Sequence, residues 1–248
     1  MSFELAANRL SADVVSFQSS ISSLQKGESL QDTVYTLNAM GIDLYCIRHS
    51  SPGSPQLVNK YSGKPVINGG DGRHSHPTQA LLDIFSIWEK LGDLKGLKIT
   101  IVGDILNSRV VRSNLIGMGK LGAKVTVCGP KTLMPGNMES VYDCRVEYDL
   151  AKALKDADVV MGLRMQLERM TEGLFPSLEE YSKHYVLSKE TLKYAKRNAL
   201  IMHPGPMNRG VEILPEIADS NHSIIVEQVA NGVAVRMALM FLILGGKA

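Results

Sequence analysis

The 248-residue sequence contains few cysteines, only one tryptophan and little net charge. Its three cysteines, Cys46, Cys128 and Cys144, show no CxxC spacing, and we expect them to be buried thiols in a reducing compartment. The formal charge is only +2, and Lys and Arg are scattered rather than gathered in a stripe with aromatic residues. The composition therefore indicates no surface for nucleic acid.

Long hydrophobic runs are also missing. The apolar stretch at 233–244 is shorter than a membrane span and contains Arg236, and we recognise no signal peptide. Low-complexity segments and repeats are absent. We therefore expect a cytoplasmic protein that binds no membrane, with enough residues for one or two domains around large apolar cores.

Helix and strand patterns alternate along the chain. Helices are expected at 2–10, 29–40, 55–61, 77–91, 110–121 and 233–244, and strands at 13–17 and in the runs "IDLYCIRH", "PVING", "LKITIVGD", "AKVTVCGP", "ADVVMGLR" and "ALIMHPGP". Such βαβ units predict parallel sheets with helices on their faces.

No glycine-proline linker divides the chain, so we place the domain break at the start of the helix at 77–91. The last helix is expected to return to the first half. We predict an α/β protein of two domains, each a parallel sheet flanked by helices. The first comprises residues 1–77 and 229–248, and the second comprises residues 78–228.

The expected strand ends carry the candidate functional residues. Open parallel sheets bind ligands at the carboxyl ends of their strands. Here these ends carry mostly cations and hydrogen-bonding groups and few carboxylates: Arg48, His76, Gln79, Arg109, Arg164 and the segment 203–206. Such a set suits an anionic ligand with more than one acidic group.

The stretch "GGDGRHSHPTQALLDIF" leads from glycines into a helix. Pro77 suits the first helical turn, where its missing N–H costs nothing, and the helix end offers free N–H donors and a partial positive charge. His76 and Gln79 can then both point at one ligand carbonyl or phosphate. The alternative is that His76 only caps the helix and Gln79 is solvated. His74 is expected at the surface.

Three further candidates also have structural alternatives. In "RMQLER", Arg164, Gln166 and Glu168 alternate, so an extended segment presents them on one side, unless it is a solvated loop. Arg48 can equally be a surface arginine. Lys26, in the serine-rich stretch "SSLQKGES", can be part of a surface tip.

Taken together and in order, these stretches resemble the catalytic chain of aspartate carbamoyltransferase over nearly the whole sequence. The matching motifs are "SSLQKGES", "IRH", "GDGRHSHPTQALLD", "VGDILNSRVVRS", "GPKTLMP", "RMQLER" and "HPGPMNRGVEI". Each is weak alone, whereas the ordered set is specific. The resemblance implies transfer of a carbamoyl group from carbamoyl phosphate to L-aspartate in pyrimidine biosynthesis, with no metal or organic cofactor.

The resemblance also implies roles for residues. Arg48 and His76 would contact carbamoyl phosphate, His76 at the carbonyl oxygen, and Gln79 would bind the carbamoyl amide; these three are the expected catalytic residues. The Pro206 segment would offer backbone carbonyls to the amine and amide.

The acceptor and the assembly follow from the same resemblance. Arg109 and Arg164 would bind the aspartate carboxylates, with support from Gln166. Ser22 and Lys26 would reach a neighbouring subunit's site, where Ser22 would contact carbamoyl phosphate and Lys26 both substrates. A homotrimer with shared active sites is therefore implied. Family members also occur with regulatory chains or with other pathway enzymes.

One departure concerns the N-terminus. The family carries a Ser-Thr-Arg-Thr-Arg phosphate loop just before "SFE", whereas this sequence reads Met1-Ser2-Phe3-Glu4. That loop would supply several donors to the phosphate. We therefore expect residues 1–248 alone to be nearly inactive.

Three alternatives remain at this point. Ornithine carbamoyltransferase shares the HPTQ-type helix start but has "HCLP" and an "SMG" loop, where this chain has "HPGP" and "RMQLER". A dinucleotide enzyme requires GxGxxG after "KITIVGD", and "DILNSRV" lacks those glycines. A non-catalytic, transcarbamoylase-like scaffold is favoured only by the missing loop.

Overall fold

The computed structural model describes residues 1–17, 29–166 and 177–246. The chain forms two compact units, which we call unit 1 (Met1–Thr78 with Asn231–Ala248) and unit 2 (Gln79–Ala230). The predicted limits, 1–77 with 229–248 and 78–228, differ from these by one or two residues. Two helices, α4 (Pro77–Leu91) and α11 (Ile225–Ile243), contribute residues to both units.

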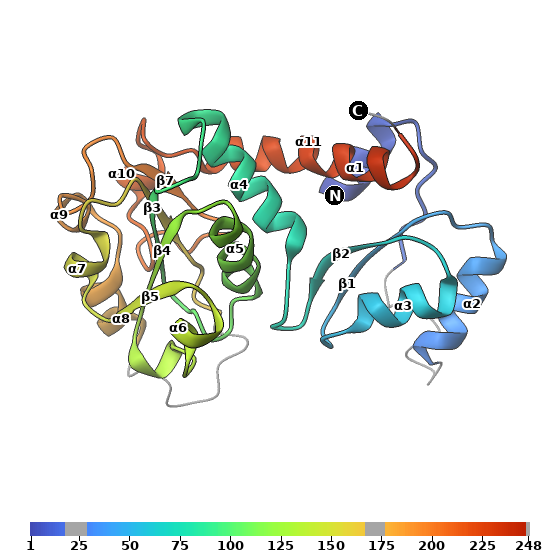
Figure 1. Cartoon of the computed structure of the whole chain (residues 1–248), viewed down its shortest axis with the longest axis horizontal. Helices are drawn as coiled ribbons and strands as arrows, with labels where there is room; N and C mark the ends of the chain where they lie inside the picture. The colour runs from blue at the N-terminus through green and yellow to red at the C-terminus, as the bar shows by residue number, and fades with distance from the viewer. Residues whose placement is uncertain (18–28, 167–176, 247–248) are drawn as a thin grey trace. The chain divides into compact units, whose positions relative to one another are not determined.

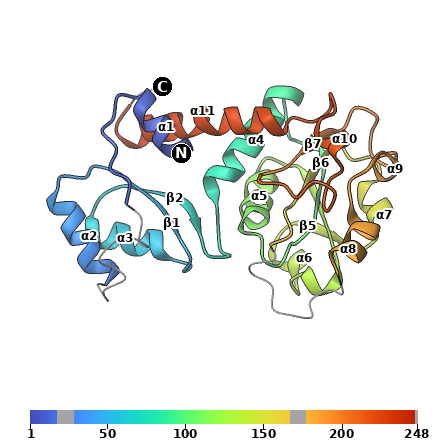
Figure 2. The ribbon, with the colours of Figure 1, turned by 180° about the vertical axis from the view of Figure 1, so that it is seen from behind.

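Unit 1 contains a two-stranded parallel sheet of β1 (Tyr45–His49) and β2 (Val66–Asp71). Its other helices are α1 (Ser2–Arg9), α2 (Leu30–Ala39) and α3 (Ser54–Ser62). Figures 1 and 2 both show α1 beside the C-terminal part of α11. Ala6 and Ala7 of α1 are buried there with Val233 and Met240 of α11 and Ile67 of β2, which gives unit 1 its own apolar core.

The strand expected at 13–17 is wrong. These residues form no helix or strand, and all of them are exposed. The alternation of "DVVSF" satisfies a strand pattern, but a strand also requires a partner for its backbone groups. Within the described ranges, no strand pairs with this segment.

Unit 2 is built on a five-stranded parallel sheet in the order β5-β4-β3-β6-β7. The strands are β3 (Lys98–Val102), β4 (Lys124–Cys128), β5 (Cys144–Glu147), β6 (Val159–Gly162) and β7 (Leu200–Met202). Its other helices are α5 (Arg109–Lys120), the 3-10 turn η2 (Lys131–Leu133), α6 (Met138–Val141), α7 (Leu150–Leu154), α8 (Leu178–Tyr185), α9 (Lys189–Leu192) and α10 (Pro215–Ala218). The predicted α/β class with parallel sheets and flanking helices is confirmed in both units.

Alternating side chains divide the core of unit 2 between the two faces of its sheet. Val159 and Met161 of β6 pack in the cluster that includes α4, α5 and α6. Val160, between them, packs in the cluster that includes α7, α10 and the start of α11. All four residues of β6 are buried, which explains its continuous apolar sequence.

The last helix is longer than expected. It begins at Ile225 rather than at residue 233, because tertiary contacts hold a first turn that carries Glu227 and Gln228. Among the described helices, α11 is the one that is long and apolar enough to cross a membrane by length and composition, whereas a helix confined to 233–244 would have been too short. Gln228 and Arg236 within it are nevertheless buried against protein groups.

Only one cysteine is buried as expected. Cys128 is buried, Cys144 is half-buried and Cys46 is exposed. Burial, with a smaller contribution from the nearby carboxylates Glu147 and Asp149, raises the pKa of Cys128 to about 12. Cys128 is therefore a neutral core side chain rather than a nucleophile.

Candidate active site

The glycine-rich loop before α4 is organised by the buried carboxylate of Asp71. Its Oδ1 accepts hydrogen bonds from Ser75 N at 3.0 Å and from Asn68 Nδ2 at 2.9 Å. Its Oδ2 accepts from Gly53 N and lies 2.9 Å from His74 Nδ1. Burial alone raises the pKa of Asp71, but these hydrogen bonds outweigh it and hold the pKa well below its usual range. The loop that presents His76 is therefore fixed by an ionised carboxylate.

Gly72 allows this loop to turn. Its φ is +51°, and a Cβ there would lie 2.8 Å from both Pro52 Cδ and Ser50 O. The loop leads into α4, which begins at Pro77 as predicted. His76, just before it, is 9% exposed, and its Nδ1 lies 3.3 Å from Thr78 Oγ1. His74 is more than half exposed, in agreement with the surface position expected for it.

A cavity of about 240 Å³ in unit 1 brings together two predicted residues, Arg48 and His76. Arg236 of α11 joins them in its lining. The guanidinium of Arg236 lies over the ring of Phe3, 4.8 Å from its centroid, and the side chain is largely buried. The lining thus includes two arginines and a histidine, residue types suited to a phosphate or carboxylate.

Sequence reasoning missed Arg236 as a site residue. The available signal is a cation inside the apolar helical run "VAVRMALM", a feature that also argues against a membrane span. A buried arginine requires an anionic or hydrogen-bonding partner.

In unit 2, Gln79 in the first turn of α4 is almost fully buried, so the alternative that it is merely solvated is wrong. Its Nε2 donates to Oδ1 of Asp83, one turn later, at 3.0 Å. Gln228 Nε2 donates to the same oxygen at 2.8 Å, and Asn114 Nδ2 donates to Oδ2 at 2.8 Å. Asp83, Asn114 and Gln228 were not predicted, because only the fold brings positions 83, 114 and 228 together.

Hydrogen bonds of buried residues also fix the segment 203–206, which follows β7. The His203 N–H donates to Gln228 Oε1 at 2.9 Å, and His203 Nδ1 accepts from Gly205 N at 3.0 Å. Gly205 has a φ of +62°, which suits glycine in this tight turn. The turn presents Pro206, and with it the backbone carbonyls of the segment, in a defined conformation.

The residues predicted to bind the substrate aspartate are Arg109, Arg164 and Gln166. They follow β3 and β6, two neighbouring strands of the sheet in unit 2. Arg109 begins α5, after β3, and is largely buried. Gln166 Nε2 donates to the carbonyl of Asn107 at 3.5 Å, so the segment after β6 lies against the segment before α5. Arg164 and Gln166 are half-buried on either side of the fully buried Met165. This alternation of burial is typical of an extended segment, in which the side chains at 164 and 166 share one side.

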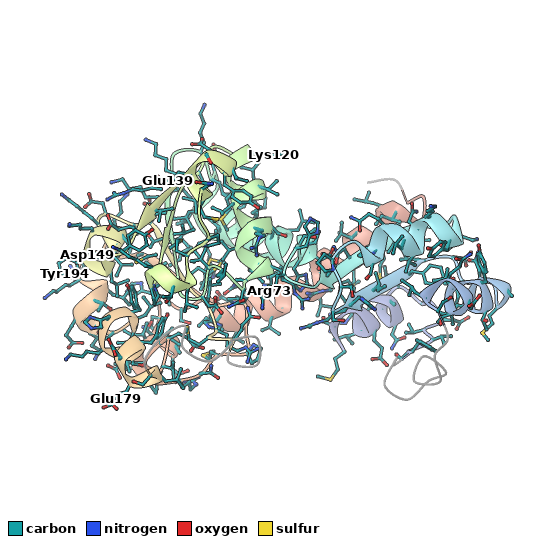
Figure 3. All side chains as sticks on the ribbon, turned by 90° about the horizontal axis from the view of Figure 1, so that it is seen from below. Arg73, Lys120, Glu139, Asp149, Glu179 and Tyr194 are labelled. Atoms are coloured by element: carbon teal, nitrogen blue, oxygen red, sulfur yellow. The ribbon has the colours of Figure 1, made fainter. Side chains whose placement is uncertain are left out.

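The predicted residues Ser22 and Lys26 lie outside the described residues. Within the described ranges, no group of three or more His, Cys, Asp or Glu side chains could hold a metal ion. A second cavity, of about 310 Å³, contains none of the predicted residues; Asp149 and Tyr194, labelled in Figure 3, belong to its lining.

Family models match both parts of the chain. Residues 1–89 match "Aspartate/ornithine carbamoyltransferase, carbamoyl-P binding domain", and residues 95–243 match "Aspartate/ornithine carbamoyltransferase, Asp/Orn binding domain". The chain is 56% identical to the aspartate carbamoyltransferase catalytic subunit of Moorella thermoacetica, over 99% of this chain and 80% of that relative. It is 54% identical to that of Roseiflexus, over 99% and 78%.

Solved structures agree with these matches. The chain resembles an ornithine carbamoyltransferase from Pyrococcus furiosus, with 31% identity and a TM-score of 0.86, over 100% of this chain and 80% of that one. It also resembles an aspartate transcarbamoylase from Trypanosoma cruzi in complex with N-(phosphonacetyl)-L-aspartic acid, with 27% identity and a TM-score of 0.87, over 100% and 79%. The resemblance found in the sequence is therefore confirmed, and the chain belongs to the aspartate/ornithine carbamoyltransferase family, with the aspartate carbamoyltransferase catalytic subunits.

Proposed function

We propose that the protein transfers the carbamoyl group of carbamoyl phosphate to the amine of L-aspartate, giving N-carbamoyl-L-aspartate and phosphate for pyrimidine biosynthesis. The single observation that carries this proposal is the cavity in unit 1, where Arg48, His76 and Arg236 gather at the end of a loop fixed by Asp71. The family membership supplies the reaction type, and the residues supply its chemistry.

The donor substrate is bound by cations and hydrogen-bonding groups. Arg48 and Arg236 neutralise the phosphate, and the His76 imidazole donates to the carbamoyl oxygen. As the amine attacks, that oxygen gains negative charge, so a fixed donor there stabilises the tetrahedral transition state more than the ground state. Gln79 and the carbonyls of the Pro206 segment receive the N–H groups of the substrates.

The acceptor is selected by charge. Arg109 and Arg164 bind the two carboxylates of aspartate, and Gln166 supports them. Guanidinium groups pair with carboxylates and repel the side-chain ammonium of ornithine. This disfavours the ornithine reaction of the structurally similar Pyrococcus furiosus enzyme.

Catalysis then consists of holding two small anions together and stabilising the charge that develops. The amine nitrogen forms a bond to the carbamoyl carbon, the C–O bond to phosphate breaks, and the amine proton passes to an oxygen of the departing phosphate. None of these reaction steps requires an electron carrier or a metal-bound nucleophile.

The assembly belongs to the same proposal. Ser22 and Lys26 serve the active site of a neighbouring subunit, so the working enzyme is a cytoplasmic homotrimer with shared sites. Regulatory chains or other pathway enzymes are candidate partners.

The test combines turnover with binding. The protein is incubated with carbamoyl phosphate and either aspartate or ornithine, and the carbamoylated product is measured by colorimetry. In parallel, calorimetry measures binding of N-(phosphonacetyl)-L-aspartate, which remains informative if turnover is slow. We expect binding of this analogue and product from aspartate only. Carbamoyl transfer to ornithine alone would overturn the proposal. So would the absence of both product and binding of the analogue.

A further inference from the structure

Asp83 lies on α4 in unit 2 and is fully buried. Its carboxylate accepts from three side-chain amides: Gln79 and Gln228 donate to Oδ1 at 3.0 and 2.8 Å, and Asn114 donates to Oδ2 at 2.8 Å. These three amides come from the first turn of α4, from α5 and from α11, which are distant in sequence. One carboxylate thus sets the orientation of three amide groups.

An ionised carboxylate only accepts hydrogen bonds. Every amide that faces it must present its nitrogen and turn its oxygen away. Asn114 shows the strength of this constraint. Its Nδ2 faces Asp83, and its buried Oδ1 has no hydrogen-bond partner among the described residues. A buried acceptor without a partner is unfavourable, so contact with the carboxylate determines the orientation of this amide.

For Gln79 the same constraint has a chemical consequence. Its Nε2 is directed to Asp83, and within the described part of the chain nothing donates to its Oε1. Gln79 therefore offers an acceptor to a ligand. The NH₂ of a carbamoyl group donates, whereas the methyl of an acetyl group does not. A Gln79 amide turned the other way would face that NH₂ with its own NH₂.

Gln228 carries the same constraint to the segment after β7. Its Nε2 faces Asp83, so its Oε1 is available to accept the His203 N–H at 2.9 Å. Both glutamines are nearly fully buried, so neither can exchange these partners for water at low cost. Asp83 thereby fixes Gln79 and the turn that presents Pro206.

We infer that Asp83 is a positioning residue that fixes the polarity of the Gln79 amide, and that it thereby makes the donor site selective for a carbamoyl group over an acetyl group. This inference rests on the proposed function. Asp83 touches no substrate in this account and acts only through Gln79 and Gln228.

The experiment compares two stable, nearly isosteric probes by calorimetry: phosphonoacetamide, which carries the NH₂, and acetonylphosphonate, which carries a methyl in its place. Wild-type protein should bind the amide more tightly. In Asp83→Ala, Gln79 is free to turn, and this preference should fall by about tenfold, the effect of one hydrogen bond. If Asp83→Ala does not fold, Asp83→Ser replaces it, because a hydroxyl both donates and accepts and so fixes no orientation.

Two further variants distinguish a change in the orientation of the Gln79 amide from a general loss of rigidity around Asp83. Asp83→Asn should keep the preference for the amide probe, because the new Oδ1 still accepts hydrogen bonds from both glutamines. The new Nδ2 would then donate to Oδ1 of Asn114, whose amide would flip by 180°. Asn114→Ala removes a donor from the other carboxylate oxygen and should lower stability without changing the preference.

The outcomes are distinct. Binding of neither probe by the wild-type protein would refute the proposed function and this inference with it. A wild-type preference that survives in the Asp83→Ala or Asp83→Ser protein, or that falls equally in Asn114→Ala, would refute the inference alone.

Discussion

The carboxylate of Asp71 accepts the backbone N–H of Ser75 at 3.0 Å, and this bond closes the loop that ends at His76. The same carboxylate also accepts from Asn68 and from Gly53 N. The position of His76 at the head of α4 therefore depends on a charged group that is itself fully buried.

Asp71→Asn should lower the free energy of unfolding at pH 7 by about 1.5–3 kcal/mol, as expected for lost hydrogen bonds to a charged group. Because the folded-state pKa is lowered, the stabilisation by Asp71 is fully present above its unfolded pKa of about 3.9 and is lost as the pH falls towards the folded value. The difference between wild type and variant in urea unfolding should therefore shrink between pH 5 and pH 3.

Asp43→Asn is the matched control for this titration. Asp43 is 80% exposed and lies 3.7 Å from Lys64 Nζ, a distance and exposure typical of a weak surface pair. Asp43→Asn should therefore change the free energy of unfolding little, both at pH 7 and at pH 3. An Asp71→Asn deficit that stays constant from pH 7 to pH 3 would contradict the role given to the ionised carboxylate.

His76→Ala should lower kcat by about 10²–10³ with little change in the binding of either substrate, because a donor to a developing oxyanion acts mainly in the transition state. Steady-state kinetics and calorimetry measure the two effects separately. Thr78→Val, which removes only the hydroxyl near Nδ1, serves as the control. A His76→Ala protein that is less stable but keeps its kcat would show that His76 is only a helix cap.

Arg164→Ala should reduce kcat/KM for aspartate by about tenfold to a hundredfold or more, the equivalent of one charged hydrogen bond of about 1.5–3 kcal/mol. Binding of carbamoyl phosphate should change far less. Arg197→Ala provides a control at an exposed arginine after α9. Unchanged kcat and KM for aspartate in the Arg164 variant would remove this residue from the acceptor site.

Mixed assemblies test whether active sites are shared. Lys26→Ala and Arg109→Ala chains are each expected to be inactive alone. When they are mixed, some interfaces should carry both wild-type residues, and part of the activity should return in a carbamoyl-transfer assay. Mixed trimers that form, as shown by native mass spectrometry, yet stay inactive would mean that each site belongs to one subunit.

Local chemistry in the sequence was enough to predict several elements. Pro77 defines the start of α4 because a proline fits where no N–H partner is needed. Ser29 is the N-cap residue of α2, and its Oγ accepts a hydrogen bond from Asp32 N at 3.2 Å. The alternation of apolar strands and helices predicted parallel sheets, and ordered motifs predicted the family.

Other features depend on contacts between distant residues, so no local pattern could predict them. The segment at 13–17 alternates like a strand but has no partner, and α11 starts eight residues earlier than expected because Gln228 is held by Asp83 and His203. The sequence alone determined which residues carry charge and hydrogen-bonding groups at the strand ends. Only the tertiary structure decided that Arg236 lines the cavity with His76, and that Asp83 orients the Gln79 amide, because burial and proximity between distant positions exist only after the chain has folded.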